Sequence, residues 1–135
     1  MNADDCLGFV DVGAFLDALS NWKQFKGVVT YMVVCGRKIP RLYGSSDILY
    51  IGESDNFGGN DRSRLWTYNY SRLPRYKNDY RIREYSRTLV SGGETVSLRI
   101  CRVPPDAQTV KQYQDSLLGK YRADHWELPP LNSQG

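Results

Sequence analysis

Apolar residues recur near the start of the chain at the spacing of a helix with one buried face. These positions are Val12, Phe15, Leu16, Leu19 and Trp22. Steps of three and four residues keep them on one side of a helix with 3.6 residues per turn. We therefore expect a helix over 12–22 that packs against the core.

Two β-branched runs follow, and a third run alternates. Residues 28–35 read "VVTYMVVC" and residues 48–51 read "ILYI", which predicts two strands. Between them, residues 36–47 have the glycine, proline and serine content of a loop. We expect an antiparallel hairpin with a long basic connection. Residues 95–103 alternate apolar with other side chains, which predicts a third strand with one buried face.

Three further helices complete the predicted order. Asparagine or aspartate can cap helices over about 60–70 and 78–86, and Pro74 separates them. Prolines open a last helix over about 107–123, and an extended "ELPPLN" follows it. The pattern predicts an α/β fold, a small domain with a three-stranded antiparallel sheet flanked by helices.

A polar residue interrupts the apolar stripe of the last predicted helix. That stripe consists of Val110, Tyr113, Leu117, Leu118 and Tyr121. Gln114 lies four residues after its first member and three before its third, so the amide falls inside the stripe. A buried amide without partners costs roughly 1 to 3 kcal/mol. Either it bonds to nearby backbone or the helix presents it to a cleft, and the spacing leaves both open.

Length and composition indicate one globular domain. The chain has 135 residues, of which 41% are hydrophobic and 24% charged, and this suits a single core over 1–135. No apolar run approaches the roughly 18 to 20 residues that span a bilayer, and the first residues lack the basic region of a secretory signal. The expected location is cytoplasmic.

Cysteine and histidine content limits the metal chemistry. Cys6, Cys35 and Cys101 form no CxxC pair, and His125 is the one histidine. A zinc cluster built from these residue types is therefore not expected. Any metal would be bound by oxygen ligands and belong to the magnesium class.

Positive charge is concentrated in one segment. Residues 62–88 contain eight bases and two acids, interleaved with six tryptophan or tyrosine residues. Arginine with aromatic residues can pair with phosphates and stack on bases, although a solvated tyrosine-rich helical surface would show the same composition. The expected nucleic-acid contacts are Arg62, Arg72, Arg75, Lys77 and Arg81, with Arg37, Lys38 and Arg41 from the predicted long loop.

Four motifs in order resemble the GIY-YIG nuclease superfamily. They are "GVVTY" from Gly27, "LYIG" at 49–52, Arg64 on the next predicted helix, and "YQDSLLGKYRADHWELPPLN" at 113–132. The first motif departs from the family pattern, because two valines and a threonine separate its glycine from its tyrosine. The resemblance covers about 27–132 and makes residues 1–26 an N-terminal helical extension.

The resemblance implies a role for each motif residue. Tyr31 and Tyr50 would position and deprotonate the attacking water, although a phenol with a pKa near 10 needs a neighbouring cation or metal to act as a base. Arg64 would hold the scissile phosphate with its forked donors. Tyr68 stands where many members have histidine, as in bacterial excision-repair incision nucleases. Asn132 would help to order the site.

The metal ligand implied by the resemblance is a glutamate three residues before a leucine pair. Here that position is Gln114, and a neutral amide offers Mg²⁺ or Mn²⁺ one oxygen without charge. The adjacent Asp115 cannot replace it, because one residue turns a helix by about 100°. An engineered inactivating substitution and a natural loss of activity would both explain the amide.

The expected function is therefore a divalent-metal-dependent endonuclease of double-stranded DNA whose cleavage is suppressed by Gln114. A non-catalytic nucleic-acid-binding module on the same fold is the first alternative. An RNA-directed protein is the second, although the aromatic strand motif of ribonucleoprotein domains is absent from the sequence.

Overall fold

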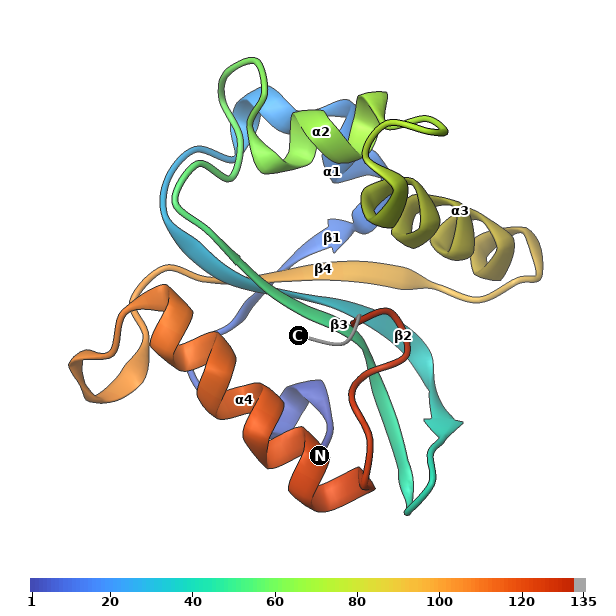
Figure 1. The fold of residues 1–135 in the computed structure, drawn as a ribbon, viewed down its shortest axis with the longest axis vertical. Helices are drawn as coiled ribbons and strands as arrows, with labels where there is room; N and C mark the ends of the chain where they lie inside the picture. Colours follow the sequence, from blue (N-terminus) through green and yellow to red (C-terminus); the bar gives the residue numbers. More distant parts are fainter. Residues whose placement is uncertain (133–135) are drawn as a thin grey trace.

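The computed structural model describes residues 1–132 and shows helices on both faces of one antiparallel sheet (Figure 1). The sheet has four strands in the spatial order β1 (Val10–Ala14), β4 (Val96–Cys101), β2 (Val29–Pro40) and β3 (Ser45–Ser54). The helices are α1 (Phe15–Ser20), α2 (Arg64–Tyr70), α3 (Lys77–Ser91) and α4 (Val110–His125), with short 3-10 turns at Ala3–Asp5, Trp22–Gln24 and Pro105–Ala107. The mixed α/β class is as predicted, whereas the three-stranded sheet was wrong.

The additional strand comes from the segment expected to be helical. Phe15, Leu19 and Trp22 are buried as the periodicity predicts, but Val12 lies in β1, where every residue is exposed. Gly13 adopts a φ of +99°, a left-handed conformation that a right-handed helix cannot contain. The helix therefore starts only at Phe15, and the residues before it pair with β4 as an edge strand.

The predicted long loop is mostly strand. β2 continues to Pro40 and β3 begins at Ser45, so the connection is only 41–44. Its turn closes with a hydrogen bond from the amide of Arg41 to the carbonyl of Gly44. The outer half of this hairpin pairs only with itself, and from Gly36 its β2 residues are largely exposed. It therefore lacks the apolar alternation by which a strand is identified in sequence.

The helix boundaries also differ from the predicted ones. α2 begins at Arg64, because its first amides donate to the carbonyls of Asn56 and Phe57 in the preceding loop. α3 is longer than expected, and α4 starts after Thr109, whose side chain accepts from the amide of Gln112. Within the part of the chain that the structure describes, none of the helices has the length and apolar character required to cross a membrane.

Alternation along β2 divides the core between the two faces of the sheet. Tyr31 and Val33 pack with α1, α2 and α3, while Met32 and Val34 pack with α4. The register of β3 shifts by one residue between the pairs Val33–Tyr50 and Val34–Ile48. A bulge of this kind turns two successive residues toward one face, and Leu49 and Tyr50 both pack on the side of Tyr31.

Both ends of the described chain cover the outer edge of β3. Asn132 accepts from the amide of Ile51 at 3.0 Å and donates to its carbonyl at 2.8 Å. The amide of Leu131 donates to the carbonyl of Leu49 at 2.9 Å. Near the other end of the strand, the amide of Asp47 donates to the side chain of Asn2 at 3.3 Å. Asn132 thus fixes the backbone directly after Tyr50.

Candidate functional site

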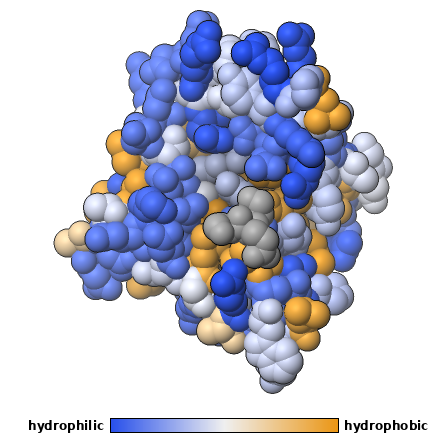
Figure 2. All heavy atoms as spheres, viewed as in Figure 1, coloured by the Kyte–Doolittle hydropathy of each residue, from blue (hydrophilic) through white to orange (hydrophobic). Residues whose placement is uncertain are grey.

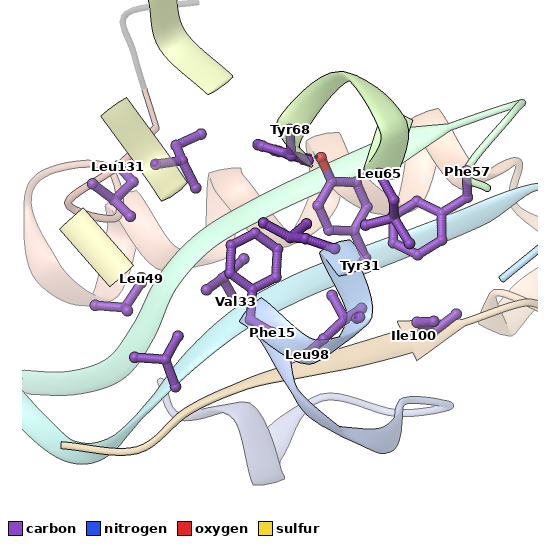
Figure 3. Close-up of a cluster of buried hydrophobic side chains, with 14 of the residues drawn as sticks. Phe15, Tyr31, Val33, Leu49, Phe57, Leu65, Tyr68, Leu98, Ile100 and Leu131 are labelled. Atoms are coloured by element: carbon purple, nitrogen blue, oxygen red, sulfur yellow. Dashed lines mark hydrogen bonds between the residues drawn. The ribbon is translucent and has the colours of Figure 1, made fainter. Parts of the chain in front are cut away.

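Three tyrosines from separate elements meet on the α1–α3 side of the sheet. The hydroxyls of Tyr31 on β2 and Tyr68 on α2 are 2.8 Å apart, and the ring centroids of Tyr31 and Tyr50 are 5.9 Å apart. Figure 3 shows the Tyr31 ring between Phe57 and Tyr68. Tyr31 and Tyr68 are buried, whereas Tyr50 is half-buried. Tyr50 is therefore the phenol of this cluster that a ligand can reach.

Gly52 makes the close approach of two of these rings possible. It is the residue opposite Tyr31 in the β2–β3 register. A Cβ atom at Gly52 would lie 2.6 Å from Cζ of Tyr31 and 2.6 Å from Cε2 of Tyr50. No side chain larger than hydrogen fits there without displacing a ring, so packing alone explains the glycine of the "LYIG" stretch.

Arg64 lies against the tyrosine cluster with part of its guanidinium free. Its Nη1 donates to both carboxylate oxygens of Asp79, at 3.0 and 2.9 Å, and its guanidinium carbon lies 5.7 Å from the centroid of the Tyr68 ring. Within residues 1–132, Nε and Nη2 have no hydrogen-bond partner, and 39% of the side chain is exposed. Two free guanidinium nitrogens of this kind have the forked geometry that can pair with two oxygens of a phosphate or a carboxylate.

Asp79 is a residue of this site that the sequence analysis missed. It lies on α3 with 8% of its surface exposed, and its carboxylate accepts both hydrogen bonds from Nη1 of Arg64. The sequence did carry a signal, since residues 62–88 contain eight bases but only two acids, and Asp79 is one of these two acids.

Burial makes the phenols of the site harder to ionise than an ordinary tyrosine. It raises the pKa values of Tyr31 and Tyr68 well above 10. Burial also raises the pKa of Tyr50, and the Arg64 cation offsets part of that increase. In this state the tyrosines can donate and accept hydrogen bonds, but none is a competent base near neutrality.

Above about pH 10 the free energy of unfolding should fall, because the folded protein retains phenolic protons that the unfolded chain releases near its ordinary pKa of 10. This part of the stability is complete below about pH 10 and is lost as the pH rises toward the folded-state values, by up to about 1.36 kcal/mol per pH unit for each phenol. Urea unfolding at several alkaline pH values measures the slope. Tyr68→Phe should reduce it by about one proton. A Tyr68→Phe slope equal to that of the parent protein would contradict the burial argument.

Gln114 and Asn132 lie apart from the tyrosine–arginine contacts. Gln114 is half-buried on α4, whose buried side chains pack on the opposite face of the sheet from Tyr31. No hydrogen bond joins the Gln114 side chain to another residue of the range 1–132. Asn132 is linked to the site through the backbone of Ile51. The structure thus brings four of the six predicted catalytic residues into contact, and convergence of the other two on the same cleft stays a prediction.

The described residues contain no group of three or more histidine, cysteine, aspartate or glutamate side chains placed to hold a metal. The carboxylate beside the tyrosines is Asp79, and both of its oxygens already accept from Arg64. Gln114 would add a neutral oxygen only.

The basic residues divide into paired and free ones. Arg41 donates to the carbonyl of Leu128 at 2.7 Å and pairs with Glu127, and Arg37 pairs with Glu94, so these two expected nucleic-acid contacts have structural partners. Lys38 is exposed on β2. The expected contacts that are exposed and lack an ion pair among residues 1–132 near α2 and α3 are Arg62, Arg72, Arg75, Lys77 and Arg81. The surface over α2 is mostly hydrophilic in Figure 2.

No family model matches the chain, and comparisons with curated proteins and with solved structures found no similar one. The GIY-YIG resemblance therefore rests on the sequence motifs alone.

Proposed function

We propose that the chain binds double-stranded DNA at a phosphodiesterase site of the GIY-YIG type, and that Gln114 suppresses cleavage. The observation that carries this proposal is the partly exposed guanidinium of Arg64, held by Asp79 beside Tyr50 with Nε and Nη2 unpaired within residues 1–132. Five further free bases near α2 and α3 supply the electrostatic attraction that a polyanion needs. The proposal keeps the cytoplasmic location expected from the sequence.

In this proposal each side chain of the site has a defined task toward one phosphate. Arg64 donates to two phosphate oxygens, and Asp79 prevents the guanidinium from turning away. The half-buried Tyr50 donates a hydrogen bond to the phosphate, while the buried Tyr31 and Tyr68 hold its ring in place. Neutral phenols and a neutral amide at position 114 activate no water, so the bound strand stays intact.

A non-catalytic binding module is the second candidate. The observation that favours it is the pairing of the Asp79 carboxylate with Arg64, because a paired carboxylate is not available to bind a metal ion. Within residues 1–132, Asp79 is the acid that contacts Arg64, and both of its oxygens are occupied there. Both candidates bind DNA without cutting it. They differ in what a glutamate at position 114 would do.

Binding to duplex DNA should weaken steeply with salt. For about five neutralised phosphates, the slope of log affinity against log salt on B-DNA is near −4 to −5. Fluorescence anisotropy with a labelled duplex across a salt series measures it, and an RNA duplex of the same sequence tests the RNA-directed alternative. An affinity that does not change with salt concentration would show that the basic surface does not bind the phosphates of a polyanion. Tighter binding to the RNA duplex than to the DNA duplex would favour the RNA-directed protein.

Removal of the Arg64–Asp79 pair tests the phosphate site itself. Arg64→Ala combined with Asp79→Ala leaves the net charge unchanged, and it leaves neither residue as a charge without its ion-pair partner. Loss of a charge-assisted hydrogen bond to phosphate should weaken binding about tenfold or more. The matched control is Lys111→Ala with Asp115→Ala, which removes an exposed ion pair on α4 and should leave the affinity unchanged. Equal affinities for the two double variants would count against the phosphate site.

A further inference from the structure

A hollow of about 290 Å³ lies beside α2, separate from the tyrosine cluster. It is lined by three arginines and three aromatic residues, namely Arg62, Trp66, Tyr70, Arg72, Arg75 and Tyr76. No acid lines it. Its volume is at the lower end of the range for small-molecule sites, so it suits one planar ring system and not a duplex.

Aromatic rings form one wall of this hollow. Trp66 and Tyr70 are four residues apart on α2, and their ring centroids are 5.1 Å apart at an interplanar angle of 48°. Tyr70 is 54% exposed, although a large aromatic ring gains most from being covered. The exposed Tyr70 ring beside the half-buried Trp66 ring offers a surface on which a base can stack.

The arginines carry charge that the protein does not neutralise. None of the three takes part in an ion pair within residues 1–132, and Arg75 lies 6.0 Å from the ring centroid of Tyr76. A turn closed by the amide of Arg72 and the carbonyl of Arg75 keeps these two close together. Arg62 and Tyr76 have φ values of 65° and 55°, in the left-handed region that side chains disfavour. Such strain concentrates at ligand sites.

We propose that this pocket receives one base turned out of a DNA duplex, with its flanking phosphates held by the arginines. This inference rests on the proposed function and narrows its substrate class to duplexes that contain an unstacked base. Trp66 follows Arg64 by two residues, a rise of about 3 Å along the axis of α2. The phosphate at Arg64 and the base at Trp66 would therefore belong to neighbouring nucleotides of one DNA strand. The two residues would contact that DNA strand from different sides of α2.

The test compares two labelled duplexes that differ only in a single-base bulge. The bulged duplex should bind about tenfold tighter or more, because stacking on an aromatic ring stabilises each unstacked base. Tyr70→Ala should remove this preference and leave the affinity for the paired duplex unchanged, while Tyr70→Phe should retain the preference. Tyr85→Ala, an exposed tyrosine of α3 outside the pocket, is the control. Thermal melts confirm that each variant is folded.

A measurement on the unmodified protein makes the result independent of any variant. With 2-aminopurine as the bulged base, binding should change its fluorescence as the base moves onto the rings. Equal affinity for both duplexes, or no change in fluorescence, overturns the inference and leaves the proposed function in place. Absence of binding to either duplex overturns both. Preference for a bulged RNA over the bulged DNA overturns the assignment of the pocket to DNA.

Discussion

Replacement of Gln114 by glutamate is expected to introduce Mg²⁺-dependent cleavage of duplex DNA. The substitution adds an anionic oxygen ligand at the position where the resemblance implies one, with almost no change in volume. A bound divalent ion supplies several kcal/mol of transition-state stabilisation, which corresponds to a rate increase on the order of a thousandfold. The carboxylate is half-buried on α4, so without metal it should lower the stability, and Mg²⁺ should restore part of that loss by binding the folded state.

A plasmid nicking series in EDTA, Mg²⁺ and Mn²⁺, run beside thermal melts in the same buffers, measures both effects. Gln112→Glu is the matched control, because it makes the same chemical change at an exposed position on the same helix and should give no cleavage. Addition of Tyr50→Phe or Arg64→Ala to the Gln114→Glu protein should abolish the nicking. A folded Gln114→Glu protein that binds DNA and stays inert in both metals would favour the binding module.

The largest expected loss of stability comes from Gly52→Ala. The new Cβ would lie 2.6 Å from ring atoms of both Tyr31 and Tyr50 and 2.7 Å from the Tyr31 hydroxyl, and the Tyr31 ring is fully buried among other core side chains. Overpacking of a core costs typically 1 to 3 kcal/mol, and displacement of the hydroxyl also breaks the bond to Tyr68. We expect the free energy of unfolding to fall by about 3 kcal/mol.

Gly119→Ala is the control for this substitution. Gly119 lies on α4, and a Cβ atom added there would meet no other segment of the described chain within 4 Å. Alanine should therefore raise the stability by about 0.5 to 1 kcal/mol through its higher helix propensity. Urea unfolding of the two variants beside the parent protein gives both values. A Gly52→Ala protein as stable as its parent would show that the rings of Tyr31 and Tyr50 do not pack closely against Gly52.

The elements with a clear apolar period could be predicted from the sequence. The alternation in residues 95–103 became β4, and the helical stripe around Leu117 became the buried side of α4. Tyr31, Tyr50, Arg64 and Tyr68 were selected from motif order, and they lie in contact with one another, while their catalytic roles stay a prediction. In each case a local pattern determined which residues face the same way.

The parts that sequence reasoning missed depend on contacts between distant segments. β1 is exposed along its whole length and is a strand only because β4 offers a free edge beside it. The outer half of the β2–β3 hairpin is held by pairing without burial of an apolar face. The partnership of Asp79 with Arg64 requires α3 to pack against α2, and no spacing along the chain expresses that packing.

The covering of the β3 edge limits how copies of this chain can associate. On β3, the amide of Asp47, the carbonyl of Leu49 and both backbone groups of Ile51 already bond to the two ends of the described chain. Within residues 1–132, β1 pairs only with β4. An unpaired edge strand is a template for pairing with another chain. One such edge lets two copies join into a closed pair, but stepwise polymerisation into fibrils needs a second edge on every copy. The folding of Asn2, Leu131 and Asn132 onto β3 thus protects the protein against growth by sheet extension.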